Sequence, residues 1–179
     1  METRIIDINV DDIRKKLKNI DGKKVKEENQ TNNIFDFPDK RMLNKKGYAR
    51  IRVVEDLLNN KFVYYMTTKK LVSQEKYKVM EEHEIEISNA EEGMEIFKSL
   101  GLELVESIQK YRESYKYKNS LIEIDINDKS FCPFPYIEIE SSSEEEIKEI
   151  VSLLGYTMED TTSETIYEIL KNKGVVKNL

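Results

Sequence analysis

The sequence predicts an α+β fold in which a sheet closes around a charged lumen and helices pack outside it. The first observation is alternation: in Glu82-His83-Glu84-Ile85-Glu86-Ile87 every second residue is acidic, and successive side chains of a strand point to opposite faces of its sheet. The second is repetition, because charged and apolar residues alternate again at 49–53, 110–112, 122–126 and 136–140. The third is that segments between the strands show the apolar spacing of amphipathic helices.

The strands follow one another along most of the chain. Residues 3–8 are expected to form the first strand, and 24–37 the second, which ends at the turn signal Pro38-Asp39. Residues 48–55 and 62–71 are expected to pair as a hairpin around Asn59-Asn60. The remaining strands are expected at 77–87, 104–117, 121–126 and 136–140.

Helices are expected between the strands and after the last of them. Ile13, Leu17 and Ile20 recur at helical spacing in the first helix. Each of the first three helices has a side chain suited to cap its start and a glycine to end it. These caps and glycines are Asn9 or Asp11 with Gly22, Ser88 or Asn89 with Gly101, and Ser142 or Ser143 with Gly155. A short last helix is expected at 165–171.

The charged strand faces could point to solvent or into a shared cavity. Acidic residues gather on 82–86, 122–126 and 136–140, whereas basic residues gather on 49–53 and 110–112. Like charges on paired strands are destabilising, so a face open to water would be expected to mix the two signs. We therefore expect the charged faces to line a closed sheet, which also removes the sheet edges. The alternative is an ordinary sheet whose charged face lies in water.

Composition and single residues exclude several classes of protein. The net charge of −6 argues against a general nucleic-acid binder. Cys132 is the only cysteine and His83 the only histidine, which argues against a disulfide framework, a zinc site rich in these residues and a Ser-His-Asp triad. No apolar run approaches the ~20 residues of a membrane span. We therefore expect a single domain over residues 1–179, located in the cytoplasm.

A lumen lined by both acids and bases is unfavourable when empty. Neighbouring carboxylates raise each other's pKa, and buried cations are costly unless they are paired. A polyphosphate held by arginine and lysine, and bridged to carboxylates by divalent cations, would relieve both problems. Oxygen ligands of this kind suit Mg²⁺ or Mn²⁺. The expected chemistry is phosphoryl or nucleotidyl transfer.

The charged residues, taken in chain order, carry a family resemblance. They are Arg50-x-Arg52, Lys69, Glu82-x-Glu84-x-Glu86, Lys110-x-Arg112, Glu123-x-Asp125 and Glu138-x-Glu140. This set, with the helices between its members, resembles the CYTH or triphosphate tunnel metalloenzyme family from residue 2 to about residue 156. Tyr111-Arg112-x-x-Tyr115 and the segment 135–140 are most similar to class IV adenylate cyclase-like members.

The resemblance implies an eight-stranded antiparallel tunnel, a triphosphate substrate and a divalent metal ion. The residues that would bind phosphate are Arg4, Arg50, Arg52, Lys69, Lys110 and Arg112. The metal ligands would come from Glu2, Glu82, Glu84, Asp125, Glu138 and Glu140. Catalytic roles would fall to Glu84, Glu138 and Lys69.

The first strand departs from the family's ExExK motif. Glu2 is retained, but Arg4 stands at the second glutamate and Ile6 at the lysine. A cation thus replaces one metal carboxylate, and an apolar group replaces one phosphate-binding cation. Arg4 could still bind phosphate through both arms of its guanidinium. Loss of one preorganised charge can lower the rate by about 10²–10³.

Three functions remain open from the sequence. The first is a metal-dependent enzyme that makes cyclic AMP and pyrophosphate from ATP, or that hydrolyses thiamine triphosphate or tripolyphosphate. The second is a weakly catalytic or non-catalytic module that binds a nucleotide or polyphosphate. The third is a scaffold whose charged sheet is only a solvated face. The partner is expected to be a nucleoside, thiamine or inorganic triphosphate, with neither nucleic acid nor membrane, and a homodimer is left open.

Overall fold

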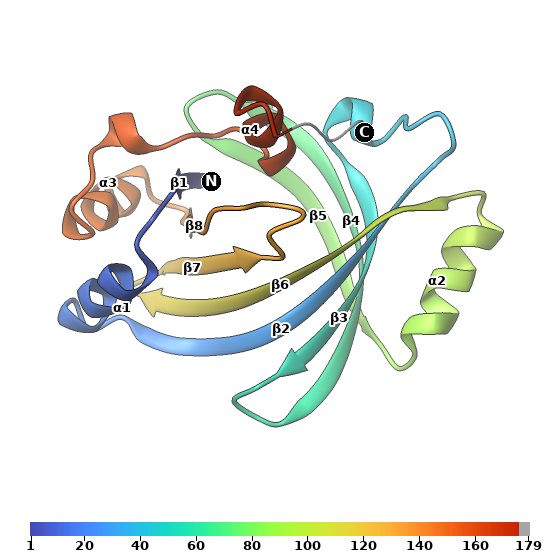
Figure 1. Ribbon diagram of the computed structural model, residues 1–179, viewed down its shortest axis with the longest axis horizontal. Coiled ribbons are helices and arrows are strands. Elements are labelled where there is room, and N and C mark those ends of the chain that lie inside the picture. The colour runs from blue at the N-terminus through green and yellow to red at the C-terminus, as the bar shows by residue number, and fades with distance from the viewer. Residues whose placement is uncertain (176–179) are drawn as a thin grey trace. The chain divides into compact units, whose positions relative to one another are not determined.

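The computed structural model describes residues 1–175, and within them eight strands close an antiparallel barrel (Figure 1). The strand order around the barrel is β1-β5-β4-β3-β2-β6-β7-β8. The strands are β1 (Glu2–Ile6), β2 (Lys23–Asp36), β3 (Tyr48–Asp56), β4 (Lys61–Gln74), β5 (Lys78–Ile87), β6 (Glu103–Tyr117), β7 (Ser120–Asn127) and β8 (Tyr136–Glu140). Each coincides with a predicted strand to within a few residues.

Helices pack outside the strands, so the predicted fold class is confirmed. They are α1 (Val10–Asn19), α2 (Ala90–Ser99), α3 (Glu144–Leu153) and α4 (Ile166–Asn172), with short 3-10 turns at η1 (Leu43–Lys45) and η2 (Met158–Asp160). The first helix starts as expected, because Asn9 Oδ1 accepts a hydrogen bond from the Asp12 backbone N–H at 3.0 Å. Asn89 and Ser143 cap α2 and α3 in the same way. None of the helices within residues 1–175 is long and apolar enough to cross a membrane.

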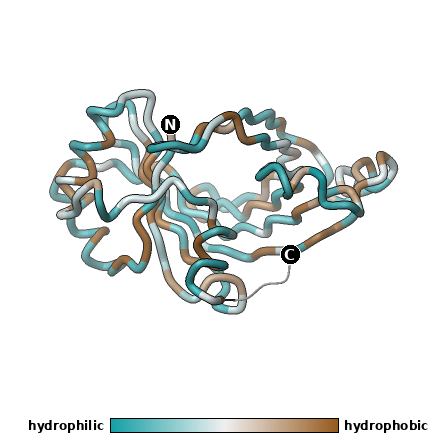
Figure 2. The backbone as a smooth tube through the Cα atoms, turned by 90° about the horizontal axis from the view of Figure 1, so that it is seen from above, coloured by the Kyte–Doolittle hydropathy of each residue, from teal (hydrophilic) through white to brown (hydrophobic). Residues whose placement is uncertain are grey.

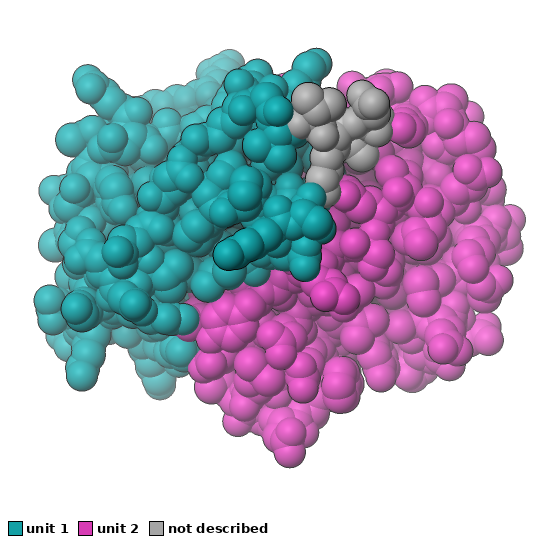
Figure 3. All heavy atoms as spheres, in the orientation of Figure 1, with its two compact units in different colours: residues 1–25, 73–79, 114–179 teal, residues 26–72, 80–113 magenta. Residues whose placement is uncertain are grey.

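The chain divides into two compact units, which Figure 3 shows in different colours. Unit 1 comprises residues 1–25, 73–79 and the described residues from 114 onward, and unit 2 comprises residues 26–72 and 80–113. Several strands contribute residues to both units. The expectation of one domain over residues 1–179 stays a prediction.

The core of unit 1 lies between one face of β1, β7 and β8 and the helices α1 and α3. Strand alternation places Ile5, Ile122, Ile124, Ile137 and Ile139 on that face. They pack with Ile13 and Leu17 of α1 and with Ile147, Ile150 and Val151 of α3. Each such side chain contributes roughly 1.5–3 kcal/mol by leaving water. Figure 2 shows hydrophobic and hydrophilic residues following one another along the strands, as this arrangement requires.

The core of unit 2 lies between α2 and one face of β2 and β3. Phe35, Ala49 and Ile51 pack there against Ala90 and Phe97 of the helix. The rings of Phe35 and Phe97 meet with their centroids 5.4 Å apart. Because alternate residues of a strand take opposite faces, this packing leaves Arg50 and Arg52 on the other side of β3. The predicted hairpin is also present, and Asn60 turns between β3 and β4 with a φ of 53°.

Candidate functional site: two charged clusters

A row of charged residues crosses three neighbouring strands in unit 1, on the face turned away from α1 and α3. Glu123 of β7 pairs in register with Glu138 of β8, and Glu138 pairs in register with Arg4 of β1. The next row joins Glu140 to Glu2, and Glu2 to Lys78 of β5. Two carboxylates directly opposite each other would destabilise this sheet. A cation is therefore needed beside them.

Arg4 supplies that cation. Its Nη2 atom forms ion pairs with both Glu2 and Glu138, although only 6% of the residue is exposed. Burial lowers the pKa of Arg4, but the charges of Glu138 and Glu2 outweigh it, so the pKa lies above its ordinary value. Glu2 has a second partner, because Lys78 Nζ lies 2.7 Å from its carboxylate. We call Glu2, Arg4, Lys78 and Glu138 the unit 1 cluster.

A C-terminal segment holds Arg4 in place. The backbone N–H of Arg4 donates to Thr162 O at 2.9 Å, and the N–H of Thr162 donates back to Arg4 O at 2.9 Å. The other arm of the guanidinium, Nη1, donates to the carbonyl of Glu164 at 2.7 Å. We call residues 162–164 the strap. Thr165 follows it and caps α4, where it forms a capping box with Glu168.

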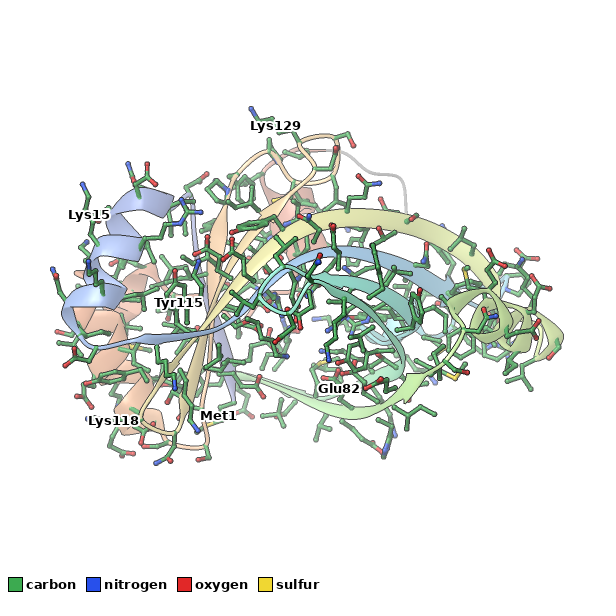
Figure 4. The ribbon with its side chains drawn as sticks, turned by 90° about the horizontal axis from the view of Figure 1, so that it is seen from below. Met1, Lys15, Glu82, Tyr115, Lys118 and Lys129 are labelled. Carbon is green, nitrogen blue, oxygen red and sulfur yellow. The ribbon has the colours of Figure 1, made fainter. Side chains whose placement is uncertain are left out.

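A second charged cluster lies in unit 2, on the face of β3, β4 and β5 opposite the α2 side. Lys69 Nζ is 2.8 Å from Glu82, and Arg50 Nη2 is 3.3 Å from Glu84. Arg52 Nη2 lies 3.9 Å from the same Glu84 oxygen. Figure 4 labels Glu82, which lies among polar side chains on the side of β5 that faces the neighbouring strands of unit 2. We call Arg50, Arg52, Lys69, Glu82 and Glu84 the unit 2 cluster.

Thr67 completes this cluster, although nothing in the sequence singled it out. It pairs in register with Arg50, and its hydroxyl donates to Glu84 at 2.6 Å. Burial raises the pKa of Glu84, but this hydrogen bond and the charges of Arg52 and Arg50 outweigh it. The pKa of Glu84 therefore lies below its ordinary value, and the side chain is ionised at neutral pH. Burial lowers the pKa of Lys69, but Tyr48 and Glu82 raise it by more.

The unit 2 cluster carries more positive charge than its acids neutralise. Burial lowers the pKa of Arg52 to about 10, and the charges of Arg50 and Arg112 act in the same direction. The charges of Glu84 and Tyr48 raise it again, but by less. In addition, the Nε atoms of Arg50 and Arg52 are buried without a hydrogen-bond partner. A buried donor without a partner costs about 1–3 kcal/mol. An anion bound here would relieve both the repulsion and the unused donors.

The predicted site residues divide between the units. Arg50, Arg52, Lys69, Lys110, Arg112, Glu82 and Glu84 belong to unit 2, whereas Glu2, Arg4, Asp125, Glu138 and Glu140 belong to unit 1. Among the unit 1 acids, Asp125 is fully buried on β7 and Glu140 is exposed at the end of β8. On β6, Lys110 and Arg112 share one face by alternation. The roles assigned to all these residues stay predictions.

The placed acids do not fit a metal site. Within residues 1–175 no three His, Cys, Asp or Glu side chains are grouped so that they could hold a metal ion. In unit 1, Glu2 and Glu138 are already bound by Arg4. In unit 2, Glu82 and Glu84 are bound by Lys69 and by the two arginines of β3.

One cluster residue was missed from the sequence, and the lone histidine and lone cysteine lie outside both clusters. Lys78 has the same parity as Glu82 and Glu84 on one strand, so its alternation could have identified it. His83 is exposed: 75% of its side chain is accessible, and its Nε2 lies 3.1 Å from Glu81 Oε1. Cys132 is buried, and its Sγ donates to Phe134 O at 3.2 Å.

Comparisons with known proteins agree with this architecture. A CYTH domain is matched over residues 1–166. Comparison with curated proteins gives no match. Among solved structures, the PH1012 protein from Pyrococcus horikoshii OT3 is 26% identical, with a TM-score of 0.72 over 94% of this chain and 98% of that one.

Two other solved structures are described as cyclases. A candidate adenylate cyclase from Vibrio parahaemolyticus is 15% identical, with a TM-score of 0.72 over 96% of this chain and 97% of that one. HpAC1 from Hippeastrum, a candidate adenylyl cyclase with a dominant triphosphatase activity, is 16% identical, with a TM-score of 0.69 over 99% and 98% of the two chains. At these identities the likeness concerns the fold alone.

Proposed function

Because the chain belongs to the CYTH family, we propose that it binds a triphosphate and acts on it slowly. The family's enzymes are adenylate cyclases or triphosphatases, they take triphosphate substrates and they use divalent metal ions. For this chain the candidate reactions are conversion of ATP to cyclic AMP and pyrophosphate, and hydrolysis of thiamine triphosphate or tripolyphosphate. The proposed setting is the cytoplasm, with a free triphosphate as the substrate.

The observation that carries this proposal is the cation excess of the unit 2 cluster. Arg50 and Arg52 have buried guanidinium groups with unused Nε donors, and the pKa of Arg52 is lowered to about 10 by burial and by its cationic neighbours. A guanidinium can bind two phosphate oxygens at once. A triphosphate, with several negative charges along a chain, matches such a set of cations better than a single phosphate does.

Slow turnover is proposed because the candidate bases are poor bases. A general base works best when its pKa lies near the working pH. The pKa of Glu84 is lowered by Thr67, Arg52 and Arg50, which outweigh its burial. Glu138 is held in an ion pair by Arg4. A carboxylate stabilised in its charged form accepts a proton from water or from a ribose hydroxyl less readily, so each of these residues would accelerate the reaction only weakly.

Lys69 is proposed to bind phosphate and to stabilise charge as a bond to phosphorus breaks. Its pKa is raised because Tyr48 and Glu82 outweigh burial, so it is cationic at neutral pH. Its Nζ lies 2.8 Å from Glu82, which orients it. Preorganised cations of this kind stabilise a transferring phosphoryl group without reorganising during the step.

Incubation with each candidate substrate tests the proposal. ATP, thiamine triphosphate and tripolyphosphate are each supplied with Mg²⁺, with Mn²⁺ and without metal, and the products are separated. Cyclic AMP with pyrophosphate would identify a cyclase, and orthophosphate would identify a hydrolase. Turnover near the usual ~10 s⁻¹ would refute slow catalysis. Failure to bind any of the three compounds would refute the triphosphate function altogether.

A second candidate is a binding module without catalysis. The observation that favours it is the first strand, where Arg4 and Ile6 replace two charged groups of the family's motif. This candidate predicts calorimetric binding of tripolyphosphate with no product over a day. Lys69→Met separates the two candidates. It should weaken tripolyphosphate binding in both, but only an enzyme would also show a loss of product formation.

A further inference from the structure

We propose that the guanidinium of Arg4 takes the place of a divalent metal ion between Glu2 and Glu138, so that these two acids bind no metal. The inference rests on the proposed function only in that a triphosphate enzyme of this family would otherwise use such a metal. The geometry of the unit 1 cluster supports it, and this geometry does not depend on any substrate.

Arg4 already neutralises Glu2 and Glu138 in the way that a bound metal ion would. One nitrogen, Nη2, forms ion pairs with Glu2 and with Glu138 at the same time. The register explains this, because Arg4 lies directly opposite Glu138 and follows Glu2 on the same face of its strand. Lys78 adds a second cation at 2.7 Å from Glu2. Glu2 therefore meets two cations and Glu138 meets one, all supplied by the chain itself.

The guanidinium is also fixed in this position. Nη1 donates to the carbonyl of Glu164, and the backbone of Arg4 exchanges two hydrogen bonds with Thr162. The strap therefore holds both the backbone and the side chain of this residue. Arg4 cannot turn away to admit a metal ion without breaking the hydrogen bond to Glu164 and both ion pairs.

Arginine is suited to this role because it stays charged. The charges of Glu138 and Glu2 hold the pKa of Arg4 above its ordinary value, so its guanidinium keeps its charge at neutral and alkaline pH. A divalent cation placed beside it would be repelled while competing for the same oxygens. Lysine would supply the same charge as a single point, whereas arginine can bind two acids and a carbonyl at once.

Mn²⁺ binding in the absence of any triphosphate tests this inference. Electron paramagnetic resonance of Mn²⁺ counts the bound ions for the wild type, Glu138→Gln, Arg4→Ala and the double variant Arg4→Ala/Glu138→Gln. We expect Glu138→Gln to leave wild-type Mn²⁺ binding unchanged. We expect Arg4→Ala to bind Mn²⁺ at least about tenfold more tightly than the wild type, and the double variant to lose this gain. Arg4→Lys is the matched control, and it should gain nothing.

Two results would overturn the inference. The first is a fall in Mn²⁺ affinity when Glu138→Gln is made in the wild type, because that acid would then be a metal ligand. The second is an Arg4→Ala variant that folds and gains no Mn²⁺. If Arg4→Ala does not fold, the wild-type comparison with Glu138→Gln decides alone. Tripolyphosphate binding is measured separately by calorimetry in metal-free buffer, so a failure of the proposed function is recognised independently.

Discussion

Replacement of Arg52 by glutamine should raise the free energy of unfolding and weaken the binding of tripolyphosphate. In the folded protein burial and the charges of Arg50 and Arg112 lower the pKa of Arg52 from its ordinary value to about 10. At about 1.4 kcal/mol per tenfold change, this difference corresponds to roughly 3 kcal/mol against the charged form. Because the pKa of Arg52 is lower in the folded protein than in the unfolded chain, this penalty on folding is fully present at every pH below about 10.

The expected gain is smaller than the whole penalty. Glutamine removes the charge but also removes the contact with Glu84 at 3.9 Å, while Glu84 keeps Arg50 at 3.3 Å. We expect the free energy of unfolding to rise by about 1–2 kcal/mol, which corresponds to roughly 2–8 °C in Tm for a chain of this size. Tripolyphosphate affinity should fall by roughly ten- to a hundredfold, because one charge-assisted hydrogen bond contributes about 1.5–3 kcal/mol.

Thermal unfolding and titration calorimetry in metal-free buffer measure the two effects on the same samples. Arg41→Gln is the matched control in unit 2, because Arg41 is exposed and pairs with Asp39 at 2.9 Å. The control should neither raise Tm nor change tripolyphosphate affinity. A lower Tm for Arg52→Gln would contradict the electrostatic reasoning, and an unchanged affinity would remove Arg52 from the phosphate site.

Four other outcomes are expected. Tripolyphosphate should stabilise the fold by about 2.7 kcal/mol at a hundred times its Kd, and orthophosphate should do much less; equal shifts in Tm would contradict a polyphosphate site. Glu84 has a lowered folded pKa, so its contribution is present above the unfolded pKa and lost as pH falls through the folded one; urea unfolding of Glu84→Gln should show a weaker acid dependence than the wild type. The double change Arg4→Glu with Ile6→Lys should raise turnover by about tenfold, or about 1.4 kcal/mol of barrier, and an unchanged rate in a folded variant would argue against the first strand as the cause. Gly47→Ala should lower Tm, because its Cβ would lie 2.5 Å from the backbone oxygen of Lys69; an unchanged Tm would mean that the backbone there yields easily.

Most of the fold could be predicted because it depends on local patterns. Alternation places Arg50 and Arg52 opposite Ile51, and the structure buries that isoleucine against α2. The caps at Asn9, Asn89 and Ser143 were readable from the sequence because a capping side chain bonds to a backbone only a few residues away. Each of these features involves neighbours in sequence, where spacing alone carries the information.

The partners within each cluster were less predictable. Thr67 reaches Glu84 because register and strand order bring them together, and neither is encoded in the alternation of a single strand. The strap has no sequence pattern, since Thr162 and Glu164 bind Arg4 through their backbone atoms. The metal-ligand set inferred from the resemblance did not anticipate that Arg4 would bind both Glu2 and Glu138. Arg4 stands where the ExExK motif has a glutamate, so Glu2 and Glu138 bind a cation at that position. The motif itself does not contain this information.

The strap also bears on how the protein is made. Arg4 and Glu164 are 160 residues apart, and β1 pairs with β8 along its whole length. Because the ribosome adds residues one after another, β1 leaves the ribosomal exit tunnel long before β8 and the strap have been synthesised. Contacts between such distant residues slow folding, and an edge left unpaired during this interval can join a neighbouring chain.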